Sequence, residues 1–446
     1  MLSILKEKFL SKDAKVAIVG LGYVGLPLAM AFSRKGFQTI GFDISENKIN
    51  TLQKGESDIA DISDEVLRKE LASNFSVTND AIAISAADAI IICVPTPLTE
   101  TMEPDMSYIT NSMEIIKAHA KKGVLVSLES TTYPGTTREF ICKTMVDCGF
   151  VLGKDFFASY SPERVDPGNK KYDTLNTPKV VGGVDEPSKE LGEILYSQVI
   201  ETVVPVNSAE VAEMSKLLEN TFRSINIAFI NEMALLAEKM DIDIWETIEA
   251  ASSKPFGFMK FTPGPGIGGH CIPLDPMYLS WKAKSKNFYS RFIELAHETN
   301  HLMPEKMVEH AAVALNKHQK AINGSRILLV GMAYKENSND LRESPGLHIY
   351  EELKKQGAQV DFCDPEAPAF QDVNGDIKHS INLEYGTFNN YDLVVLLTGH
   401  NIFDMEAIGQ NSRLILDTKN LLKDGFENKK VSYGKMEERK YLTYEK

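Results

Sequence analysis

Apolar and polar positions alternate in blocks along this chain. From Lys15 onward, short apolar runs typical of buried strands are separated by amphipathic stretches typical of helices. Such alternation predicts a parallel sheet covered by helices. The candidate strands of this first part are KVAIVG (15–20), QTIGFD (38–43), ADAIIICVP (87–95), GVLVSLES (123–130), FFASYSP (156–162), KVVGG (179–183) and ETVVPV (201–206).

The pattern changes at residue 207. Residues 207–240 contain no proline or glycine, and their apolar positions recur at helical spacing. They predict one long helix of roughly 50 Å, and further helical stretches continue to about residue 318. A helix this long and apolar commonly forms a spine between domains or a subunit interface. The alternative is a buried core helix within a monomer.

Strand-like and helical stretches alternate again after Ser325. The strand candidates here are RILLVGMAY (326–334), QVDFCDP (359–365), DLVVLLTG (392–399) and RLILDT (413–418). We therefore expect an α/β protein in which two Rossmann-like domains, each a parallel sheet flanked by helices, are joined by a helical middle domain with one long spine helix. The expected boundaries are 1–206, 207–318 and 319–446.

Composition narrows the class of protein. The 446 residues suggest two or three domains, and 43% hydrophobic with 25% charged residues is typical of a soluble globular protein. The net charge of −14 argues against nucleic acid or an anionic membrane as the main partner. No signal peptide or membrane-spanning run is recognised. The five scattered cysteines form no CxxC pair, so we expect a reducing cytoplasm and no metal site.

The first strand leads into a glycine motif, Gly20-x-Gly22-x-x-Gly25. In a strand–turn–helix unit the first glycine permits the tight turn, the second lets a pyrophosphate approach, and the third lets helix and strand pack closely. Asp43 closes the next strand, where a carboxylate binds both ribose hydroxyls and repels the extra phosphate of NADP. The motif therefore predicts an NAD site; the alternative is a glycine turn used only for packing. The later run LLVGMAY lacks the second and third glycines, which favours another ligand there.

A second glycine-rich stretch, GPGIGGHCIPLDP (264–276), holds a single thiol, Cys271. We expect a rigid loop whose backbone comes close to a ligand. Free backbone N–H groups there favour a reactive thiolate, whereas Cys93 and Cys363 lie in apparent strands and are expected to be structural. Asp275 is expected on the same loop, where it can accept a proton or orient water. The adjacent His270 is expected to be structural. A thiol in a dehydrogenase indicates aldehyde oxidation through a thiohemiacetal and a thioester.

These residues belong to a series of ordered motifs. The series is GLGYVGLPLA, VPTP (94–97), ESTTYPGT (129–136), SPERV (161–165), EMSKLLENTFRSINIAFINE (213–232), GPGIGGHCIPLDP and GMAYKENSNDLRESP (331–345). It covers nearly the whole chain and resembles the UDP-glucose/GDP-mannose dehydrogenase family, with the UDP-N-acetylglucosamine 6-dehydrogenase branch the most similar. The resemblance implies that a sugar C6 alcohol on a nucleotide sugar is oxidised to a carboxylate while two NAD are reduced.

The resemblance also assigns roles to catalytic residues. It makes Cys271 the thioester nucleophile, Lys216 the cation that stabilises negative charge on the sugar oxygen, and Asn220 a partner that holds that oxygen or a water. It makes Asp275 the acid that assists proton transfer and hydrolysis. The resemblance implies that the catalytic water and the nicotinamide end of the cofactor are positioned by Glu163 and Thr131.

Binding residues follow from the same resemblance. The cofactor is expected to contact Gly20, Gly22, Tyr23, Val24, Gly25, Asp43, Pro95, Thr96 and Thr131. The substrate is expected to contact Glu163, Arg164, Lys216, Asn220, Gly268, Lys335 and Arg342. The resemblance implies NAD binding in 1–206, a central dimerisation domain in 207–318 and UDP-sugar binding in 319–446, with a homodimer or higher oligomer as the assembly.

Each of these residues has a plainer interpretation when it is taken alone. Lys216 and Asn220 would ordinarily form a solvated helix face, Glu163 and Asp275 would be surface acids, and Arg342 would form a surface ion pair with a neighbouring acid. Only their occurrence together with the thiol and the glycine motif favours the functional interpretation.

The sugar is the least determined part of the prediction. His270 and Leu274 stand where UDP-glucose enzymes more often have a serine and a lysine, which favours UDP-N-acetylglucosamine over UDP-glucose. UDP-N-acetylgalactosamine and UDP-N-acetylmannosamine remain open. The rival functions are a two-electron hydroxyacid-type dehydrogenase, which needs no thiol, and a non-catalytic NAD-binding regulator. The expected destination of the product is surface polysaccharide.

Overall fold

The computed structural model describes residues 1–59, 62–99, 101–165, 171–423 and 425–435. Contacts divide the chain into two units, which we describe separately. The first holds Met1–Glu219 and Met277–Tyr289, and the second holds Asn220–Pro276 and Ser290–Lys446. Two helices, α8 (Ala209–Lys239) and α10 (Asp275–Lys284), contribute residues to both units.

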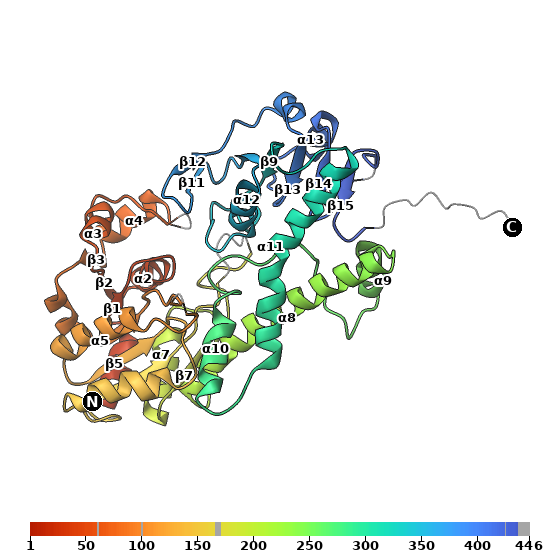
Figure 1. The fold of residues 1–446 in the computed structure, drawn as a ribbon. Helices are drawn as coiled ribbons and strands as arrows, with labels where there is room; N and C mark the ends of the chain where they lie inside the picture. The colour runs from red at the N-terminus through yellow and green to blue at the C-terminus, as the bar shows by residue number, and fades with distance from the viewer. Residues whose placement is uncertain (60–61, 100, 166–170, 424, 436–446) are drawn as a thin grey trace. The chain divides into compact units, whose positions relative to one another are not determined.

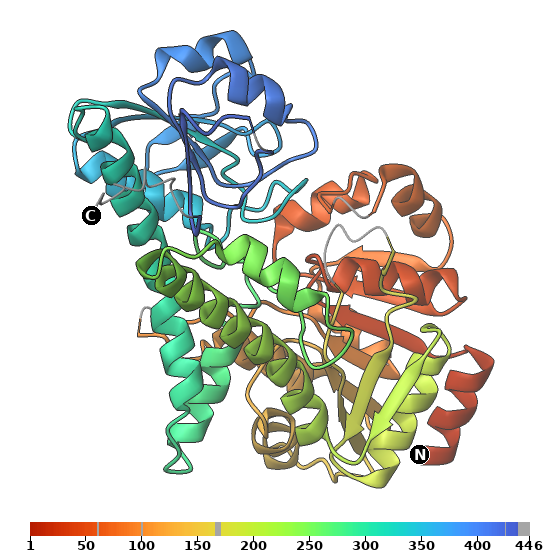
Figure 2. The same ribbon diagram turned by 90° about the vertical axis from the view of Figure 1, so that its right-hand side faces the viewer.

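The first unit is built on a mixed sheet. In the described residues its eight strands have the order β3-β2-β1-β4-β5-β6-β7-β8, and all neighbours are parallel except β6 and β7. Figure 2 shows β7 and β8 side by side at one edge of this sheet. The strands are β1 (Lys15–Val19), β2 (Gln38–Phe42), β3 (Phe75–Thr78), β4 (Ala89–Ile92), β5 (Val124–Leu128), β6 (Phe156–Tyr160), β7 (Lys179–Gly183) and β8 (Val203–Val206).

Successive residues of β1 enter two different cores, because side chains of a strand point alternately to its two faces. Val16 and Ile18 pack with α1, α2 and α7, whereas Ala17 and Val19 pack with α5 and α6. The sheet is therefore covered on both faces, as Figure 1 shows. The helices are α1 (Leu2–Ser11), α2 (Gly25–Arg34), α3 (Glu46–Gln53), α4 (Asp64–Leu71), α5 (Ser107–His119), α6 (Lys143–Asp147) and α7 (Glu186–Ser197), with shorter turns η1 (Ala81–Ala86) and η2 (Thr137–Cys142).

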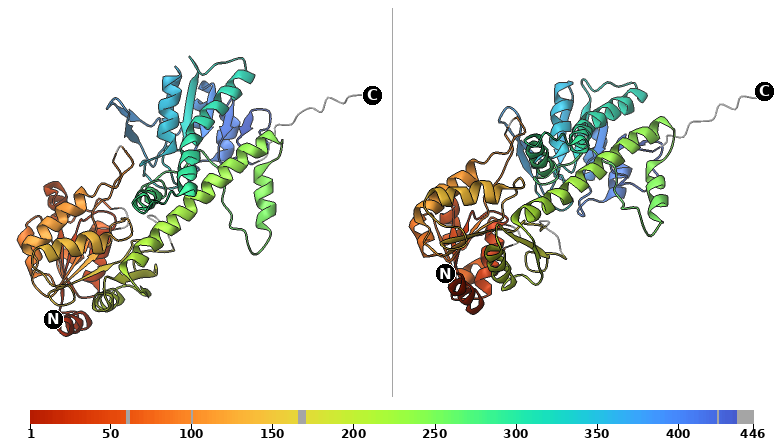
Figure 3. Two further views of the ribbon diagram at one scale, coloured as in Figure 1. Left: turned by 60° about the horizontal axis from the view of Figure 1, so that its bottom comes forward. Right: turned by 90° about the horizontal axis from the view of Figure 1, so that it is seen from below.

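The second unit has a parallel sheet of the order β10-β9-β13-β14-β15. Ile327 and Leu329 pack against α8, α9, α11 and α12, while Leu328 and Val330 pack against η3 and α13 on the other face. Figure 3 shows the long helices α8 and α11 from two sides. The elements are β9 (Arg326–Val330), β10 (Gln359–Cys363), β13 (Leu393–Leu396), β14 (Ile415–Asp417), β15 (Lys430–Ser432), α9 (Ile244–Ser252), α11 (Arg291–Lys317), α12 (Pro345–Lys355), η3 (Tyr385–Asn390), α13 (Met405–Asn411) and a hairpin of β11 (Ala369–Gln371) and β12 (Ile377–His379).

The predicted fold class is confirmed, and the structure corrects two local expectations. The long helix runs over Ala209–Lys239, within two residues of the predicted range. The glycine-rich loop, however, ends at Leu274, because Asp275 is already the first residue of α10. A proline at an early helical position needs no N–H, so the Asp275–Pro276 pair suits a helix start rather than a loop. The last two strands of the first sheet also run against the other six, which the sequence pattern does not reveal.

Candidate active site

The three glycines of the first motif occupy three different environments. Gly20 has φ +92°, and a Cβ there would lie 2.7 Å from the carbonyl oxygen of Cys93. A Cβ on Gly25 would lie 1.8 Å from the carbonyl oxygen of Gly20, so only glycine lets α2 approach the turn. A Cβ on Gly22 would meet nothing within 4 Å, so the backbone is open on that side. This is the arrangement required for a phosphate that approaches the second glycine.

The surroundings of the turn fit the same ligand. The turn lies at the carboxyl end of β1, next to β4, where the order of strands reverses and ligands of such sheets bind. No side chain caps the N-terminus of α2, so its positive dipole end suits a pyrophosphate. Asp43 follows β2, and its two carboxylate oxygens accept hydrogen bonds from the N–H groups of Leu21 (3.0 Å) and Ser45 (2.9 Å). The loop therefore holds this carboxylate in place for the ribose.

The remaining predicted cofactor residues lie in the glycine turn itself and after the neighbouring strand β4. Tyr23 is exposed and Val24 half-buried in the glycine turn. Pro95 and Thr96 follow β4, and the carbonyl of the buried Thr96 accepts a hydrogen bond from the hydroxyl of Tyr278 at 2.9 Å.

Lys216 contacts Thr131 inside the first unit. Its Nζ donates a hydrogen bond to Thr131 Oγ1, and both residues are buried. Asn220, one turn further along α8, is buried as well. The interpretation of these two α8 residues as a solvated face is therefore wrong. A positive charge held in a buried site stabilises negative charge that develops nearby, so Lys216 has the chemistry for that role.

Glu163 is also largely buried, in the segment that follows β6. Its Oε1 accepts the N–H groups of Arg164 and Val165 at 2.8 Å each. Its Oε2 accepts Nζ of Lys179 at 3.2 Å, and Lys179 also binds Glu129. Arg164 itself pairs with Glu219 on α8 at 2.7 Å. Glu163 is therefore not a surface acid.

In the second unit, the cysteine loop reaches the start of α10. Cys271 is half-buried, and its carbonyl accepts the N–H of Asp275 at 2.9 Å. Asp275 is buried, and its Oδ2 accepts Nδ2 of Asn220 at 2.6 Å. The thiol residue and the buried carboxylate thus lie four residues apart in the chain, and the amide of Asn220 on α8 contacts that carboxylate. This is the combination expected for covalent catalysis with proton transfer.

The two glycines before the thiol have a packing role. A Cβ on Gly268 would lie 2.5 Å from Cβ of Tyr334, and one on Gly269 would lie 2.6 Å from the ring of that tyrosine. The N–H of Gly269 donates to the carbonyl of Arg342 at 2.8 Å. The loop after β9 therefore packs closely against both glycines and fixes the position of the cysteine loop, while the approach of a ligand to this backbone stays a prediction.

That same loop after β9 holds the two predicted nucleotide-sugar cations. Lys335 is half-buried. Arg342 is exposed and forms a forked pair with Asp340, with N···O distances of 2.7 to 3.2 Å. The surface ion pair that is expected of Arg342 when this residue is taken alone is therefore present.

Sequence reasoning missed a third cation in this unit, Lys419. It follows β14 and lines a small polar pocket with Gly266, Gly331, Ser344 and Thr398, at the ends of β9 and β13. In the described part of the chain its ammonium makes no hydrogen bond or ion pair, and burial lowers its pKa. A cation of this kind at the strand-order reversal of a parallel sheet suits a phosphate. The signal available was a lone lysine directly after the apolar run RLILDT.

The second sheet lacks the accessible carboxylate that favours NAD at the first sheet, in line with its incomplete glycine motif. Asp364, which follows β10 as Asp43 follows β2, is fully buried. Its Oδ2 accepts the N–H groups of Met332 and Ala333 and contacts Nε2 of His400 at 3.1 Å. This carboxylate is used internally and is closed to a ribose.

Family models match the chain in three consecutive parts. The NAD-binding domain of the UDP-glucose/GDP-mannose dehydrogenase family matches residues 14–200, the central domain matches 210–302, and the UDP-binding domain matches 328–424. In the described helices, no segment is both long and apolar enough to cross a membrane.

Individual relatives agree with these models over nearly their whole length. The UDP-N-acetyl-D-glucosamine 6-dehydrogenase of Pseudomonas aeruginosa is 36% identical, over 92% of this chain and 98% of its own. The structure of a UDP-D-ManNAc dehydrogenase from Pyrococcus horikoshii matches with a TM-score of 0.87 at 30% identity, over 95% of this chain and 100% of the other. An NDP-N-acetyl-D-galactosaminuronic acid dehydrogenase from Methanosarcina mazei matches with a TM-score of 0.82 at 30% identity, over 97% and 98%.

The glycine turn lies in the part of the chain that the NAD-binding model matches, and Lys419 lies in the part that the UDP-binding model matches. The chain belongs to the UDP-glucose/GDP-mannose dehydrogenase family and is an NAD-dependent oxidoreductase of the UDP-sugar dehydrogenase type.

Proposed function

We propose that this protein oxidises the C6 hydroxyl of a UDP-N-acetylhexosamine, with UDP-N-acetylglucosamine as the first choice, to the uronic acid. The observation that carries the proposal is the grouping of Cys271, Asn220 and Asp275 at the start of α10. Two NAD per sugar, bound in turn at the glycine motif, accept the four electrons. The thiol of Cys271 adds to the C6 aldehyde, and oxidation of that thiohemiacetal gives a thioester.

The other residues move protons and hold charge. Lys216, buried beside Thr131, stabilises negative charge on the sugar oxygen. Hydrolysis of the thioester requires water to attack the carbonyl carbon, the C–S bond to break and the thiolate to leave. Glu163 takes the proton of that water, and Asp275, oriented by Asn220, assists proton transfer.

The nucleotide is assigned to the second sheet. We propose that Lys335, Arg342 and Lys419 bind the diphosphate. Their cationic groups lie on loops at the carboxyl ends of the strands, where ligands of parallel sheets bind. Arg342 can exchange Asp340 for a phosphate oxygen, because an exposed ion pair of this kind contributes little energy.

The choice of sugar rests on two kinds of support. His270 and Leu274 flank the thiol in place of the residues typical of UDP-glucose enzymes. The relatives named above act, by their names, on N-acetylated sugars of different configuration at C2 and C4. UDP-N-acetylmannosamine and UDP-N-acetylgalactosamine are therefore the alternatives.

The experiment is an NADH assay over UDP-N-acetylglucosamine, UDP-N-acetylgalactosamine, UDP-N-acetylmannosamine and UDP-glucose, with Cys271→Ser and Cys148→Ser as a matched pair. Cys148 is an exposed cysteine at the end of α6, so its variant controls for loss of a thiol as such. We expect Cys271→Ser to abolish formation of the acid and Cys148→Ser to leave it intact. Undiminished turnover of Cys271→Ser would leave the two-electron rival, which needs no thiol, as the better assignment.

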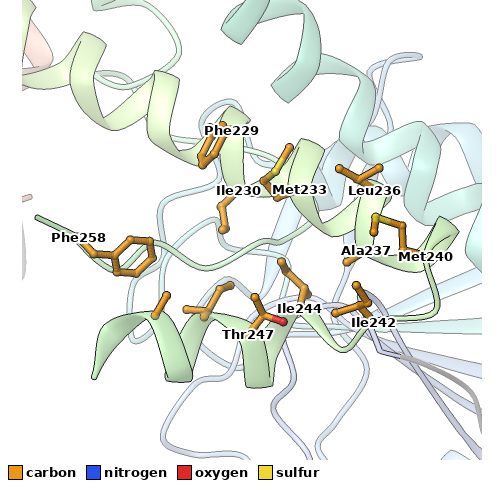
Figure 4. A pocket seen from close by; sticks show the side chains of 12 residues that line it. Phe229, Ile230, Met233, Leu236, Ala237, Met240, Ile242, Ile244, Thr247 and Phe258 are labelled. Carbon is orange, nitrogen blue, oxygen red and sulfur yellow. The ribbon is translucent and has the colours of Figure 1, made fainter. Parts of the chain in front are cut away.

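We also propose that the assembly is a homodimer or higher homo-oligomer formed through the second unit. A groove between α8 and α9 is lined almost wholly by apolar side chains, among them Phe229, Met233, Leu236 and Phe258 (Figure 4). Phe229 is 54% exposed, although exposed apolar patches of this kind are uncommon on soluble monomers. A second copy of the same helix pair would cover it around a twofold axis. Sedimentation velocity tests this: Phe229→Ser should shift the protein towards the monomer, whereas a monomeric parent protein would contradict it.

The predicted domain roles complete the proposal. We assign NAD binding to 1–206, a central dimerisation role to 207–318 and UDP-sugar binding to 319–446. All cysteines of the described chain are free thiols, which supports a reducing cytoplasm as the place of action.

A further inference from the structure

Lys179 lies buried between two carboxylates in the first unit. Its Nζ is 3.0 Å from Glu129 Oε2 and 3.2 Å from Glu163 Oε2, and the three side chains are 5%, 0% and 12% exposed. Removing three charges from water costs several kcal/mol per ion before their attraction is counted. Apolar side chains of the same size would fill this space at lower cost. The cluster therefore calls for an explanation other than stability.

The sheet topology brings these residues together. Glu129 directly follows β5, and Glu163 comes shortly after the neighbouring parallel strand β6. Lys179 is the first residue of β7, which is antiparallel to β6 in the register Tyr160↔Gly182. Continued outward, that register sets Glu163 opposite Lys179. The reversal of β7 is what places a lysine at the carboxyl ends of β5 and β6.

The carboxylate of Glu163 is held at both oxygens. Two backbone N–H groups bind Oε1 and the ammonium of Lys179 binds Oε2. Burial alone would raise the pKa of Glu163, but Lys179, the N–H of Val165 and the charge of Lys216 outweigh it, so its pKa is lowered. Glu163 is therefore an ionised, oriented acceptor.

Glu129 lies behind the lysine, away from solvent. Its Oε1 has no hydrogen-bond partner in the described chain, and burial together with the charge of Glu163 raises its pKa. The ring of Tyr196 covers Lys179, with Nζ 5.4 Å from the ring centroid. On the side of Glu129 and Tyr196 the cluster is therefore shielded from solvent. The titratable groups facing it are Lys179 on β7, Glu129 after β5, Cys93 after β4, Tyr196 on α7 and Lys216 on α8.

We propose that Lys179, with Glu129 behind it, is the positioning residue that fixes the orientation and ionised state of Glu163 during thioester hydrolysis. The inference rests on the proposed role of Glu163 as the group that takes the proton from the attacking water. Lys179 touches neither substrate nor cofactor in this scheme. It acts through Glu163 alone.

The pH dependence of turnover separates this role from a structural one. Activity that needs ionised Glu163 is present above its pKa and falls as the pH drops through it. In the double variant Glu129→Gln/Lys179→Met the cation is gone and no buried charge is left unpaired behind it. The acid limb of the plot of kcat against pH should then shift to higher pH by about one unit or more. In Glu129→Gln alone, a neighbouring anion is removed, so the acid limb should move to lower pH.

Asp155→Asn is the matched control. Asp155 is a buried carboxylate paired with Lys122 at 3.1 Å, at the amino end of β6, on the far end of the same strand. The Asp155→Asn variant should leave the acid limb of the kcat profile at the same pH, even where the substitution lowers the melting temperature. The Michaelis constant for the UDP-sugar should stay within about twofold in all variants that fold, because a group acting only through Glu163 changes kcat. Equal loss of kcat at every pH, with no displacement of the limb in either Glu129 variant, would overturn the proposal.

A second measurement separates failure of this inference from failure of the proposed function. If the parent protein oxidises no UDP-sugar, the proposed function is wrong, and the ionisation of Glu163 is then measured by infrared spectroscopy. A band of protonated glutamic acid should appear in Glu129→Gln/Lys179→Met at a pH where the parent lacks it, and should vanish when Glu163→Gln is added. Absence of that band would contradict the inference whatever the substrate is.

Discussion

Gly22 and Gly268 show how the same residue type serves two purposes. The first leaves open space beside the backbone, while the second packs against Tyr334 and the carbonyl of Glu343. Neither has a positive φ, so alanine is compatible with the backbone at both. What differs is the neighbour that an added methyl group meets.

Gly22→Ala should therefore weaken NAD binding at unchanged stability, because its methyl group enters the space assigned to the pyrophosphate. Gly268→Ala should cost about 1–3 kcal/mol of stability, because its Cβ collides with Cβ of Tyr334. Thermal unfolding without ligand and NAD titration measure the two effects. A stability loss at Gly22 equal to that at Gly268 would contradict the assignment.

We propose that Asp43 determines the preference for NAD over NADP. Its carboxylate is fixed by two backbone N–H groups, so Asp43→Asn should keep the turn while removing the negative charge. The ratio of kcat/KM with NAD to that with NADP should fall about tenfold or more, since repulsion of the 2′-phosphate is lost. An unchanged ratio would show that another residue selects the cofactor.

The candidate site was predictable where a residue belongs to an ordered motif. Cys271, Lys216 and Asn220 came from such motifs, and the structure finds the latter two buried rather than solvated. Glu129 and Lys179 were missed, although each is a charge at the end or start of an apolar strand. Their meeting depends on the reversed direction of β7, which no local pattern encodes.

At the scale of elements, helix α8 supports the loop that carries Thr131. Glu213, one turn before Lys216, accepts the N–H of Thr137 (2.8 Å) and its hydroxyl (2.7 Å), and it also accepts the N–H of Gly135. In the described chain no cation pairs with it. Burial raises its pKa to about 7, although these hydrogen bonds oppose the rise.

The raised pKa gives a stability effect of definite sign. Folded Glu213 binds its proton more tightly than the unfolded chain does, so the folded state loses stability as the pH rises from about 4.5 to about 7. The loss amounts to about 3 kcal/mol. Glu213→Gln has no titrating group at this position, so it should lack this pH-dependent contribution to stability. The difference between the denaturation midpoints of parent and variant should therefore shrink or change sign between about pH 4.5 and pH 7. A constant difference between them from pH 4.5 to 7 would contradict the raised pKa.

Element boundaries were predictable where periodicity is sustained. The long apolar repeat located α8 to within two residues at its N-terminus. The edge strands β3 and β15 were missed, because each is only three or four residues long and has few apolar positions. The start of α10 was missed because the glycines before it dominate the pattern, although the Asp–Pro pair is itself a helix signal.

At the scale of the whole molecule, two sheets of similar construction take different ligands. The first has an open second glycine and a presented carboxylate, which fit NAD. The second has its equivalent carboxylate closed by backbone and His400, and cations on the loops at its strand ends. Because the chain carries a net charge of −14, we propose that these local cations are the groups that bind an anionic substrate.

The most direct test counts NADH against sugar in one reaction mixture. Purified protein is given a limiting amount of UDP-N-acetylglucosamine with excess NAD, and the product is identified by mass. We expect two NADH for each sugar consumed, the uronic acid as the only product and no free aldehyde. One NADH per sugar, with an aldehyde or ketone as the product, would contradict the four-electron reaction through Cys271.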